Sequence, residues 1–438
     1  MEVKEGNLQA PKRAAIDWKN PDYYDEESLQ NEMERVFDAC HGCRRCVSLC
    51  ESFPTLFDLI DESDTFEVDG VAKSDYVKVV DECFLCDLCA ETKCPYLPPH
   101  EWAIDFPHLM LRAKAQKYKA GETKWRDRLL TSTDTTLSVL SAPGIKGLVN
   151  KSLSSKPIRT LVDKTVGLHK DAPLPVFNRS RTDERSTEDS RSGDEQSKSR
   201  VAIFVSCYDK YTDEPLTDDL SEVLKFNQIA TKIIQNTNCC GMPKLELGNL
   251  KQVEKLKDGN LPALLEAIES GYDIISTIPS CVLMYKQELP LMFPDEEDIT
   301  KVKDHFFDPF EYLMKQTKEG LIKLDFVNSL GSVSYHAACH QRVQNFGAKT
   351  RDFLSLIPDT EVSMIERCSG HDGTYAVKSE SYEKSLKIVR PVQRQIKEQS
   401  SDHVGSDCPM AGRLITHNLE ENKEATHPLT MVRYAYGI

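Results

Sequence analysis

Residues 201–209 read VAIFVSCYD, a short apolar run that ends near Cys207. Runs of this length, rich in β-branched residues, are typical of buried strands. The pattern returns in DIISTIPSC, SVSYHAACH, VSMIERCSG and SDCPMAG, each of which ends at or near a cysteine, and helical segments such as Leu216–Ile229 separate the runs. This alternation predicts one α/β domain over 201–438 with an internal duplication, and its ligands are expected at the carboxyl ends of the strands.

The amino-acid composition excludes several classes of function and favours one. The chain has 438 residues, of which 15 are cysteines, and a net charge of −15. An acidic chain without a basic face is not expected to bind nucleic acid. The first 13 residues are polar and no apolar run reaches 18 residues, so neither a signal peptide nor a spanning helix is expected. The odd cysteine count in a predicted cytoplasmic protein therefore indicates metal or redox chemistry rather than disulfides.

Eight cysteines lie in two tight runs, CHGCRRCVSLC over 40–50 and CFLCDLCAETKCP over 83–95. Three thiolates separated by two residues can bind three irons of a cubane cluster, and in two-cluster ferredoxins the fourth cysteine of each run binds the cluster of the other run. The runs therefore predict two [4Fe–4S] clusters. The two predicted ligand sets are Cys40, Cys43, Cys46 and Cys94, and Cys83, Cys86, Cys89 and Cys50.

The alternative to these clusters is zinc held by paired CxxC motifs, which do not require the third cysteine present in both runs. Around the runs, periodicity predicts a helix over Glu27–Ala39, helical structure over 51–82, and a helix over 100–121 with a kink at Pro107. Residues 1–124 are therefore expected to form an N-terminal α-helical ferredoxin domain.

The segment 125–200 is expected to connect the two domains. Residues 125–177 carry an excess of Lys and Arg among scattered apolar residues, which fits either a connector that wraps the protein or an amphipathic piece at a membrane surface. Residues 178–200 contain no apolar residue, so they are predicted to be a flexible polar linker.

Seven cysteines follow the linker, at Cys207, Cys239, Cys240, Cys281, Cys339, Cys368 and Cys408. The first four, with CCG at 239–241, resemble the cysteine-rich CCG domain of heterodisulfide reductase subunits and related iron–sulfur oxidoreductases. The motifs ERCSGHDG and SDCPMAG are similar to the C subunit of anaerobic glycerol-3-phosphate dehydrogenase and its relatives. The resemblance covers residues 25–120 and 200–430 and implies two CCG units, each with a metal site.

Both units depart from the pattern of a cysteine, CCG and CPxC. Ile278, Arg367 and Ala411 stand where the family has cysteines, which leaves four thiols in the first unit and three in the second. The first unit can still hold a further iron–sulfur cluster. The second needs a non-cysteine ligand, for which His371 is the first choice, ahead of His336 and His340. The alternatives are a three-thiolate cluster, no metal, histidines that only form hydrogen bonds, and cysteines that are only buried.

No GxGxxG follows a strand, so no nucleotide or flavin site is expected, and no catalytic residue is assigned. The resemblance implies an iron–sulfur electron-transfer subunit that passes electrons from a flavoprotein dehydrogenase to a quinone or a redox protein. The expected location is cytoplasmic, with possible peripheral contact with the inner membrane. Two alternatives are a thiol–disulfide reductase of the heterodisulfide type and a soluble donor to a rubrerythrin-type, ferritin-like protein that scavenges peroxide.

Overall fold

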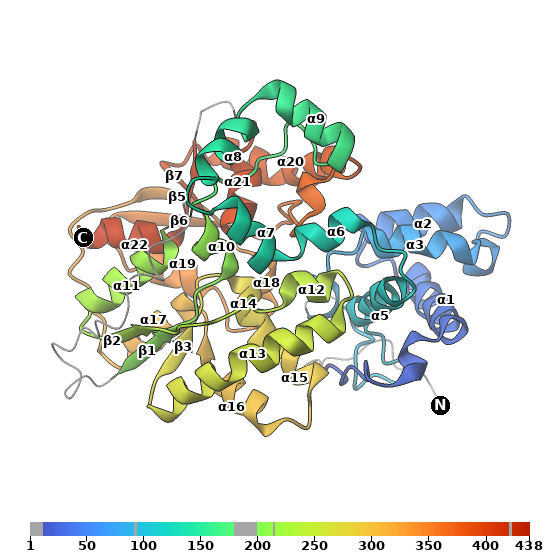
Figure 1. Ribbon diagram of the computed structural model, residues 1–438, viewed down its shortest axis with the longest axis horizontal. Helices are drawn as coiled ribbons and strands as arrows, with labels where there is room; N and C mark the ends of the chain where they lie inside the picture. The colour runs from blue at the N-terminus through green and yellow to red at the C-terminus, as the bar shows by residue number, and fades with distance from the viewer. Residues whose placement is uncertain (1–11, 92–93, 179–198, 213–214, 420–422) are drawn as a thin grey trace.

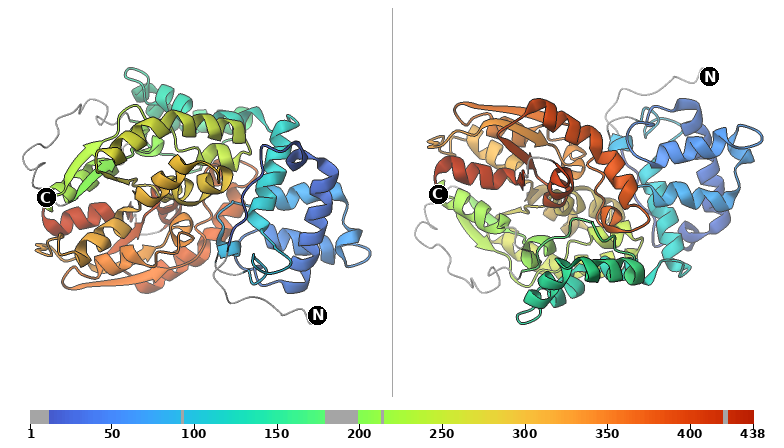
Figure 2. Two further views of the ribbon diagram at one scale, coloured as in Figure 1. Left: turned by 90° about the horizontal axis from the view of Figure 1, so that it is seen from below. Right: turned by 90° about the horizontal axis from the view of Figure 1, so that it is seen from above.

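The computed structural model describes residues 12–91, 94–178, 199–212, 215–419 and 423–438. A helical N-terminal part lies beside a larger α/β part, and Figure 2 shows the two side by side in both views. Most of the linker predicted over 178–200 falls outside the described residues.

The N-terminal part is helical, as expected. Its α-helices are α1 (Glu26–Cys43), α2 (Ser52–Asp61), α3 (Tyr76–Asp81), α4 (Leu88–Glu91) and α5 (Phe106–Lys119). Phe37, Phe53 and Phe106 are buried from three of these helices, and the rings of Phe53 and Phe106 lie 4.6 Å apart between centroids. The spacing of Leu29, Met33, Val36 and Phe37 that predicted α1 is also the face that α1 buries.

The kink predicted at Pro107 is wrong. Residues 100–105 are not helical, and α5 begins at Phe106, so Pro107 lies in its first turn. Proline is tolerated there because the first turn of a helix does not use its N–H groups. The Asp105 side chain caps the helix by accepting the His108 N–H at 3.1 Å. The proline therefore marks the start of the helix.

The α/β part contains two parallel sheets with the same strand order, β2-β1-β3-β4 and β6-β5-β7-β8. The first holds β1 (Arg200–Ile203), β2 (Ala230–Ile233), β3 (Asp273–Ile275) and β4 (Phe306–Phe307). The second holds β5 (Gly331–His336), β6 (Thr360–Ile365), β7 (His403–Ser406) and β8 (Ala425–Thr426). The shared order confirms the predicted duplication (Figure 1).

Helices surround the sheets in corresponding places. In the first unit they are α10 (Cys207–Tyr211), α11 (Leu216–Phe226), α12 (Met242–Glu246), α13 (Leu250–Glu269), α14 (Pro279–Leu283), the π-helical η5 (Met284–Glu288), α15 (Leu289–Met292), α16 (Glu297–His305) and α17 (Pro309–Lys318). In the second they are α18 (Cys339–Arg342), α19 (Lys349–Leu354), α20 (Tyr382–Gln399), α21 (Pro409–Thr416) and α22 (Pro428–Tyr436).

The two units pack on each other reciprocally. The last helix of the first unit, α17, contacts α19 of the second, and the last helix of the second unit, α22, contacts α11 of the first. One apolar core runs through both units and includes Val201 and Ile275 from the first sheet and Val333 and Leu429 from the second unit. The two sheets therefore belong to one domain.

The connector is more regular than the sequence suggested. It forms α6 (Trp125–Leu130), α7 (Thr133–Leu140), α8 (Lys146–Leu153) and α9 (Lys156–Val166), which lie over the α/β part in Figure 1. Arg126 fixes it to the second unit by bonding the Glu380 carboxylate at 2.6 and 2.9 Å. No helix in the described part of the chain is long and apolar enough to cross a membrane.

The N-terminal part docks closely on the α/β part. Gly248 has a φ of +83°, and a Cβ there would lie 2.4 Å from the backbone of Lys114 in α5. Only glycine allows this approach. Trp18 packs edge-on against Phe293, with 5.8 Å between ring centroids, and Glu82 bonds Tyr375 and Lys384. Backbone contact, aromatic packing and polar bonds thus hold the two parts together.

Candidate metal centres

The seven C-terminal cysteines lie where the strands end, as predicted for an α/β domain. Cys207 begins α10 after β1, and Cys281 lies on α14 after β3. In the second unit, Cys339 begins α18 after β5 and Cys408 caps α21 after β7. Cys239, Cys240 and Cys368 follow the neighbouring strands β2 and β6. Each unit therefore brings its thiols to one edge of its own sheet.

The four thiols of the first unit lie together. The Sγ atoms of Cys207 and Cys239 are 3.8 Å apart. Hydrogen bonds from the Cys207 and Cys240 thiols hold the pKa of Cys239 well below its usual value, and the bond from Cys240 also raises that group's own pKa. Cys281 is close enough to bond Cys240. The set favours a thiolate at Cys239, which is the form that binds metal.

The connector helix α7 completes the surroundings of this set, which the sequence did not indicate. The carboxylate of Asp134 accepts the backbone N–H of Cys239 at 2.8 Å. The Thr133 hydroxyl lies beside Cys207 and Cys239 and acts to lower the pKa of each thiol, although the bond to Cys239 and burial raise the pKa of Cys207 well above its usual value. Because α7 comes from outside the CCG units, the connector helps to shape the first site.

The three thiols of the second unit also lie near one another, and burial raises the pKa of Cys368 and of Cys408 to about 11. Burial and the charges of these two cysteines also raise the pKa of Cys339. The N–H of Gly370 lies 3.4 Å from the Cys368 sulfur. Gly370 has a φ of +72°, and a Cβ there would lie 2.4 Å from the Ser385 carbonyl oxygen, so the turn that aims this N–H requires glycine.

The three candidate histidines of the second unit differ in their hydrogen bonds. His336 uses both ring nitrogens, on Ser406 Oγ and on the Arg367 carbonyl, each at 3.0 Å. His340 bonds Ser280 Oγ at 2.7 Å and also bonds the backbone of Leu85. The Nε2 atom of His371 is buried and has no hydrogen-bond partner among the described residues. Burial lowers the pKa of His371 to about 4, which keeps the ring neutral. Among the three, His371 fits a ligand role best.

Cysteines of the two N-terminal runs lie near one another across the runs. Burial and the charges of Cys94, Cys46 and Cys43 raise the pKa of Cys40. Cys94, the fourth cysteine of the second run, therefore lies near the first run. Cys50 lies beside Cys83, and charges on Cys83, Cys86 and Cys50 act on Cys89. The thiols predicted to share a cluster therefore lie near one another, while iron binding stays a prediction.

The donors around these thiols fit an iron–sulfur group. Burial raises the pKa of Cys50, while the N–H groups of Ser52 and Phe53 at the start of α2 act to lower it. The N–H groups of Tyr96 and Leu97 do the same at Cys94. Backbone N–H bonds to sulfur stabilise cluster thiolates and tune their potentials.

A single metal ion fits the thiols less well. No group of three or more His, Cys, Asp or Glu side chains within the described ranges is placed to hold one metal ion. A cubane cluster differs because each thiolate binds a different iron, so its thiolates need not converge on one point.

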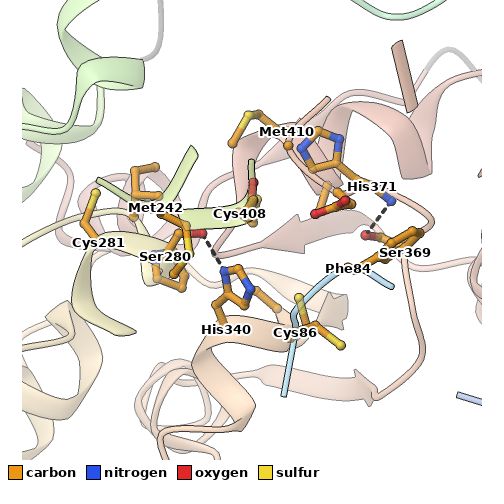
Figure 3. Close-up of a pocket in the computed structure, with 18 of the residues that line it drawn as sticks. Phe84, Cys86, Met242, Ser280, Cys281, His340, Ser369, His371, Cys408 and Met410 are labelled. Atoms are coloured by element: carbon orange, nitrogen blue, oxygen red, sulfur yellow. Dashed lines mark hydrogen bonds between the residues drawn. The ribbon is translucent and has the colours of Figure 1, made fainter. Parts of the chain in front are cut away.

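The cysteine groups follow one another through the molecule. Burial and the charge of Cys46 in the first N-terminal group raise the pKa of Cys89 in the second. Burial and the charges of Cys339 and Cys368 in the second CCG unit raise the pKa of Cys86. A cavity of about 110 Å³ then joins the two CCG units, because Cys86, Cys207, Cys240, Cys281, Cys339, Cys368 and Cys408 all line it. Figure 3 shows Phe84 and Cys86 entering this cavity opposite Cys281 and Cys408.

Two partly buried carboxyl groups beside this cavity carried no signal in the sequence. Glu246, in α12, and Asp372 line both the cysteine cavity and a polar cleft of about 490 Å³ that also contains Lys114 and Lys378. Burial raises the pKa of Glu246 well above its usual value and that of Asp372 to about 6. They mark the boundary between the cleft and the cysteines.

A buried ionic cluster joins the N-terminal part to η5 and was also not expected. Arg13 bonds Asp105 at 2.6 Å and Asp87 at 2.9 Å. His108 lies with one ring nitrogen 3.2 Å from Asp105 and the other 3.5 Å from Glu288. Burial lowers the pKa of His108, but the charge of Asp105 and the hydrogen bonds to Asp105 and Glu288 together outweigh this effect and raise the pKa to about 9.

The fold and the cysteine groups together define a protein built on a duplicated α/β domain with cysteines at its strand ends. The family model of the cysteine-rich CCG domain matches residues 201–286 and again residues 333–410, so the chain carries this domain twice.

Two of its relatives are subunits of a dehydrogenase and of a reductase, and the chain is homologous to both. It is 28% identical to the C subunit of anaerobic glycerol-3-phosphate dehydrogenase of Escherichia coli (strain K12) over 329 residues, which are 75% of this chain and 81% of the relative. It is also 28% identical to the B subunit of fumarate reductase (CoM/CoB) of Methanothermobacter marburgensis over 228 residues, which are 51% of this chain and 43% of the relative. An uncharacterized iron–sulfur protein of Methanococcus maripaludis is 26% identical over 229 residues, which cover 51% of this chain and 42% of the relative.

Proposed function

We propose that this chain is the electron-transfer subunit of an oxidoreductase complex. It takes electrons from a flavoprotein dehydrogenase subunit and passes them to a quinone or a redox protein. Two [4Fe–4S] clusters would be held by the crossed N-terminal ligand sets, a further cluster by Cys207, Cys239, Cys240 and Cys281, and an altered site by Cys339, Cys368, Cys408 and His371. Iron–sulfur groups supply single-electron transfer.

The unbroken succession of cysteine groups is the observation that carries this proposal. Cys86, from the second N-terminal group, lines the same cavity as the thiols of both CCG units. Electron transfer needs neighbouring redox groups more than it needs a substrate pocket. The homology to two oxidoreductase subunits supports the same role.

Iron content tests this proposal. In protein purified anaerobically we expect more than about eight irons per chain, because two [4Fe–4S] clusters account for eight. Cys43→Ala should remove about four irons, and Cys240→Ala should lower the count independently. Ser369→Ala, beside Cys368 but without a thiol, is the control. Zinc in place of iron, or eight irons unchanged by Cys240→Ala, would contradict the proposal.

The connector supports a peripheral membrane contact in the same role. Its outer surface exposes large apolar side chains, including Leu148 (70% exposed), Leu161 (61%) and Val139 (55%), beside Lys151 and Lys164. Basic and apolar side chains together suit the surface of an anionic membrane. Flotation with anionic liposomes should recover the parent chain, and Leu148→Glu combined with Leu161→Glu should lower that recovery. Equal recovery of both proteins would exclude this contact.

A thiol–disulfide reductase is the second candidate, and the shared cysteine cavity favours it. A small disulfide placed there would face thiols of both CCG units. The replacement of family cysteines at Ile278, Arg367 and Ala411 weighs against it. Reduced methyl viologen with a small disulfide distinguishes the two, because sustained turnover is expected only of a reductase.

A further inference from the structure

An apolar cavity of about 350 Å³ lies between the connector and the α/β part, on the side of the first cysteine set. Connector side chains form much of its wall: Leu130, Leu137, Leu140, Val149 and Leu153. Leu174 and Phe177 from the end of the connector and Leu414 from α21 also line it. Ligand cavities of this size are typically apolar with a few polar groups that orient the ligand.

The inner end of this cavity touches the first metal site. Cys207 lines both the apolar cavity and the cysteine cavity, and Thr133, which lies beside Cys207 and Cys239, also lines the apolar one. A flat molecule in the cavity would therefore lie against the thiols expected to hold a redox group.

Polar groups stand at a few points on the apolar wall. The Thr212 hydroxyl is buried and has no hydrogen-bond partner among the described residues. The Tyr208 hydroxyl lies on the same wall, 3.5 Å from an Arg413 nitrogen. Donors on an otherwise apolar wall suit a ring that carries carbonyl oxygens.

The cavity also has a route to the surface. A groove of about 590 Å³ shares Leu153, Leu174 and Pro175 with it and continues along α9 past Lys156 and Arg159. The outer faces of α8 and α9 around this groove expose Leu148 and Leu161. An apolar tail could follow the groove outward while its ring stays against Cys207.

From this arrangement we infer that the cavity under the connector binds a quinone, with the ring beside Cys207 and the tail in the groove along α9. The inference rests on the proposed function, because it names the acceptor and its site. The quinone accepts two electrons, one at a time, from the reduced iron–sulfur groups, and two protons, and becomes the quinol. The protons come from water in the polar cleft, which meets the apolar cavity at Glu246.

Binding of decylubiquinone to the oxidised protein, measured by titration calorimetry, tests the site directly. Leu137→Trp places a larger side chain in the cavity, and we expect about tenfold weaker binding or more. Thr212→Val keeps the shape and removes one donor, so we expect binding weaker by about fivefold. Leu324→Trp adds the same bulk at an exposed position that lines neither the cavity nor the groove, and it should bind like the parent.

Anaerobic reoxidation of the dithionite-reduced protein, followed by absorbance, gives the second readout. Decylubiquinone should reoxidise the parent and Leu324→Trp quickly and Leu137→Trp slowly, while ferricyanide should reoxidise all three equally. Unchanged quinone binding and reoxidation in Leu137→Trp would overturn the inference. If ferricyanide oxidises the parent but decylubiquinone neither binds nor oxidises it, the quinone site fails and the proposed electron-transfer role stands. If the protein holds no reducible group, the proposed function itself fails.

Discussion

Hydrogen bonding separates His371 from His336, although both are buried and both have a pKa near 4 because of burial. The two ring nitrogens of His336 are used by Ser406 and Arg367, whereas His371 Nε2 has no partner among the described residues. A buried polar atom without a partner costs about 1–3 kcal/mol unless a ligand uses it. The cost at His371 is therefore consistent with a metal bound there.

His371→Ala should lower the iron bound by the second unit and change its electron paramagnetic resonance signal. His336→Gln is the matched control, because it alters a buried histidine whose nitrogens are already used. It should lower stability but leave the iron content unchanged. The same iron content in both variants would show that His371 is not a ligand.

A second effect at the scale of single residues concerns pH. The pKa of His108 is raised to about 9, above its ordinary value of about 6.5. Its charged form therefore stabilises the folded protein fully below pH 6.5, and this contribution is lost as the pH rises through 9. The shift corresponds to about 3 kcal/mol at most.

The melting temperature of the parent chain should fall between about pH 7 and pH 9.5. The His108→Gln protein should melt at a lower temperature at pH 7, and its melting temperature should change little across this range. His305→Gln removes a half-exposed histidine that pairs with Asp273 and serves as the control. A parent curve as flat as that of His108→Gln would contradict the assignment of charge to His108.

At the scale of elements, α7 joins the connector to the first metal site through one carboxylate. Asp134 accepts the Cys239 N–H at 2.8 Å, and loss of such a buried acceptor costs about 1–3 kcal/mol. Asp134→Ala should therefore alter the absorbance and redox potential of the first-unit cluster. Asp134→Asn keeps an acceptor oxygen and should restore most of the parent signature. Identical spectra for Asp134→Ala and the parent would show that α7 only covers the site.

Several elements could be predicted from the sequence because their signals are local. Five of the cysteine-bearing strand ends and α1 follow from runs of apolar residues and from helical spacing. The strands β4 and β8 have two residues each, too few to show any periodicity. The prediction of a kink at Pro107 was wrong because the helical periodicity did not show that the helix begins just before this proline.

The candidate site was predictable to a similar extent. Cysteine spacing indicated which thiols group together, because the ligand rules are local. The roles of Asp134, Glu246 and the Arg13–His108 cluster depend on contacts between distant segments, and no short motif encodes those contacts. Nothing in the spacing showed that the second N-terminal group faces the second CCG unit.

At the scale of the whole molecule, close docking of the N-terminal part keeps the cysteine groups in succession. Gly248→Ala would place a Cβ 2.4 Å from the α5 backbone and should separate the two parts. Gly271→Ala is a matched control, since Gly271 has a φ of +82° but no atom within 4 Å of the added Cβ, so it should show only the backbone strain.

Limited proteolysis and small-angle scattering should report a more open Gly248→Ala protein than Gly271→Ala. Its N-terminal clusters, once reduced, should also equilibrate more slowly with the CCG sites. If both variants remain equally compact, α5 can shift to accommodate the methyl group and docking does not depend on this glycine.

The reciprocal contacts of α17 with α19 and of α22 with α11 bear on the origin of the domain. Each half contributes the same two surfaces to these contacts, as each subunit does in a two-fold symmetric homodimer. The domain thus has the form of two half-length ancestral subunits joined by gene fusion. Before fusion, every mutation changed both copies at once. Afterwards each half mutated separately, so one could replace one family cysteine while the other replaced two, and an unequal pair of centres became accessible to selection.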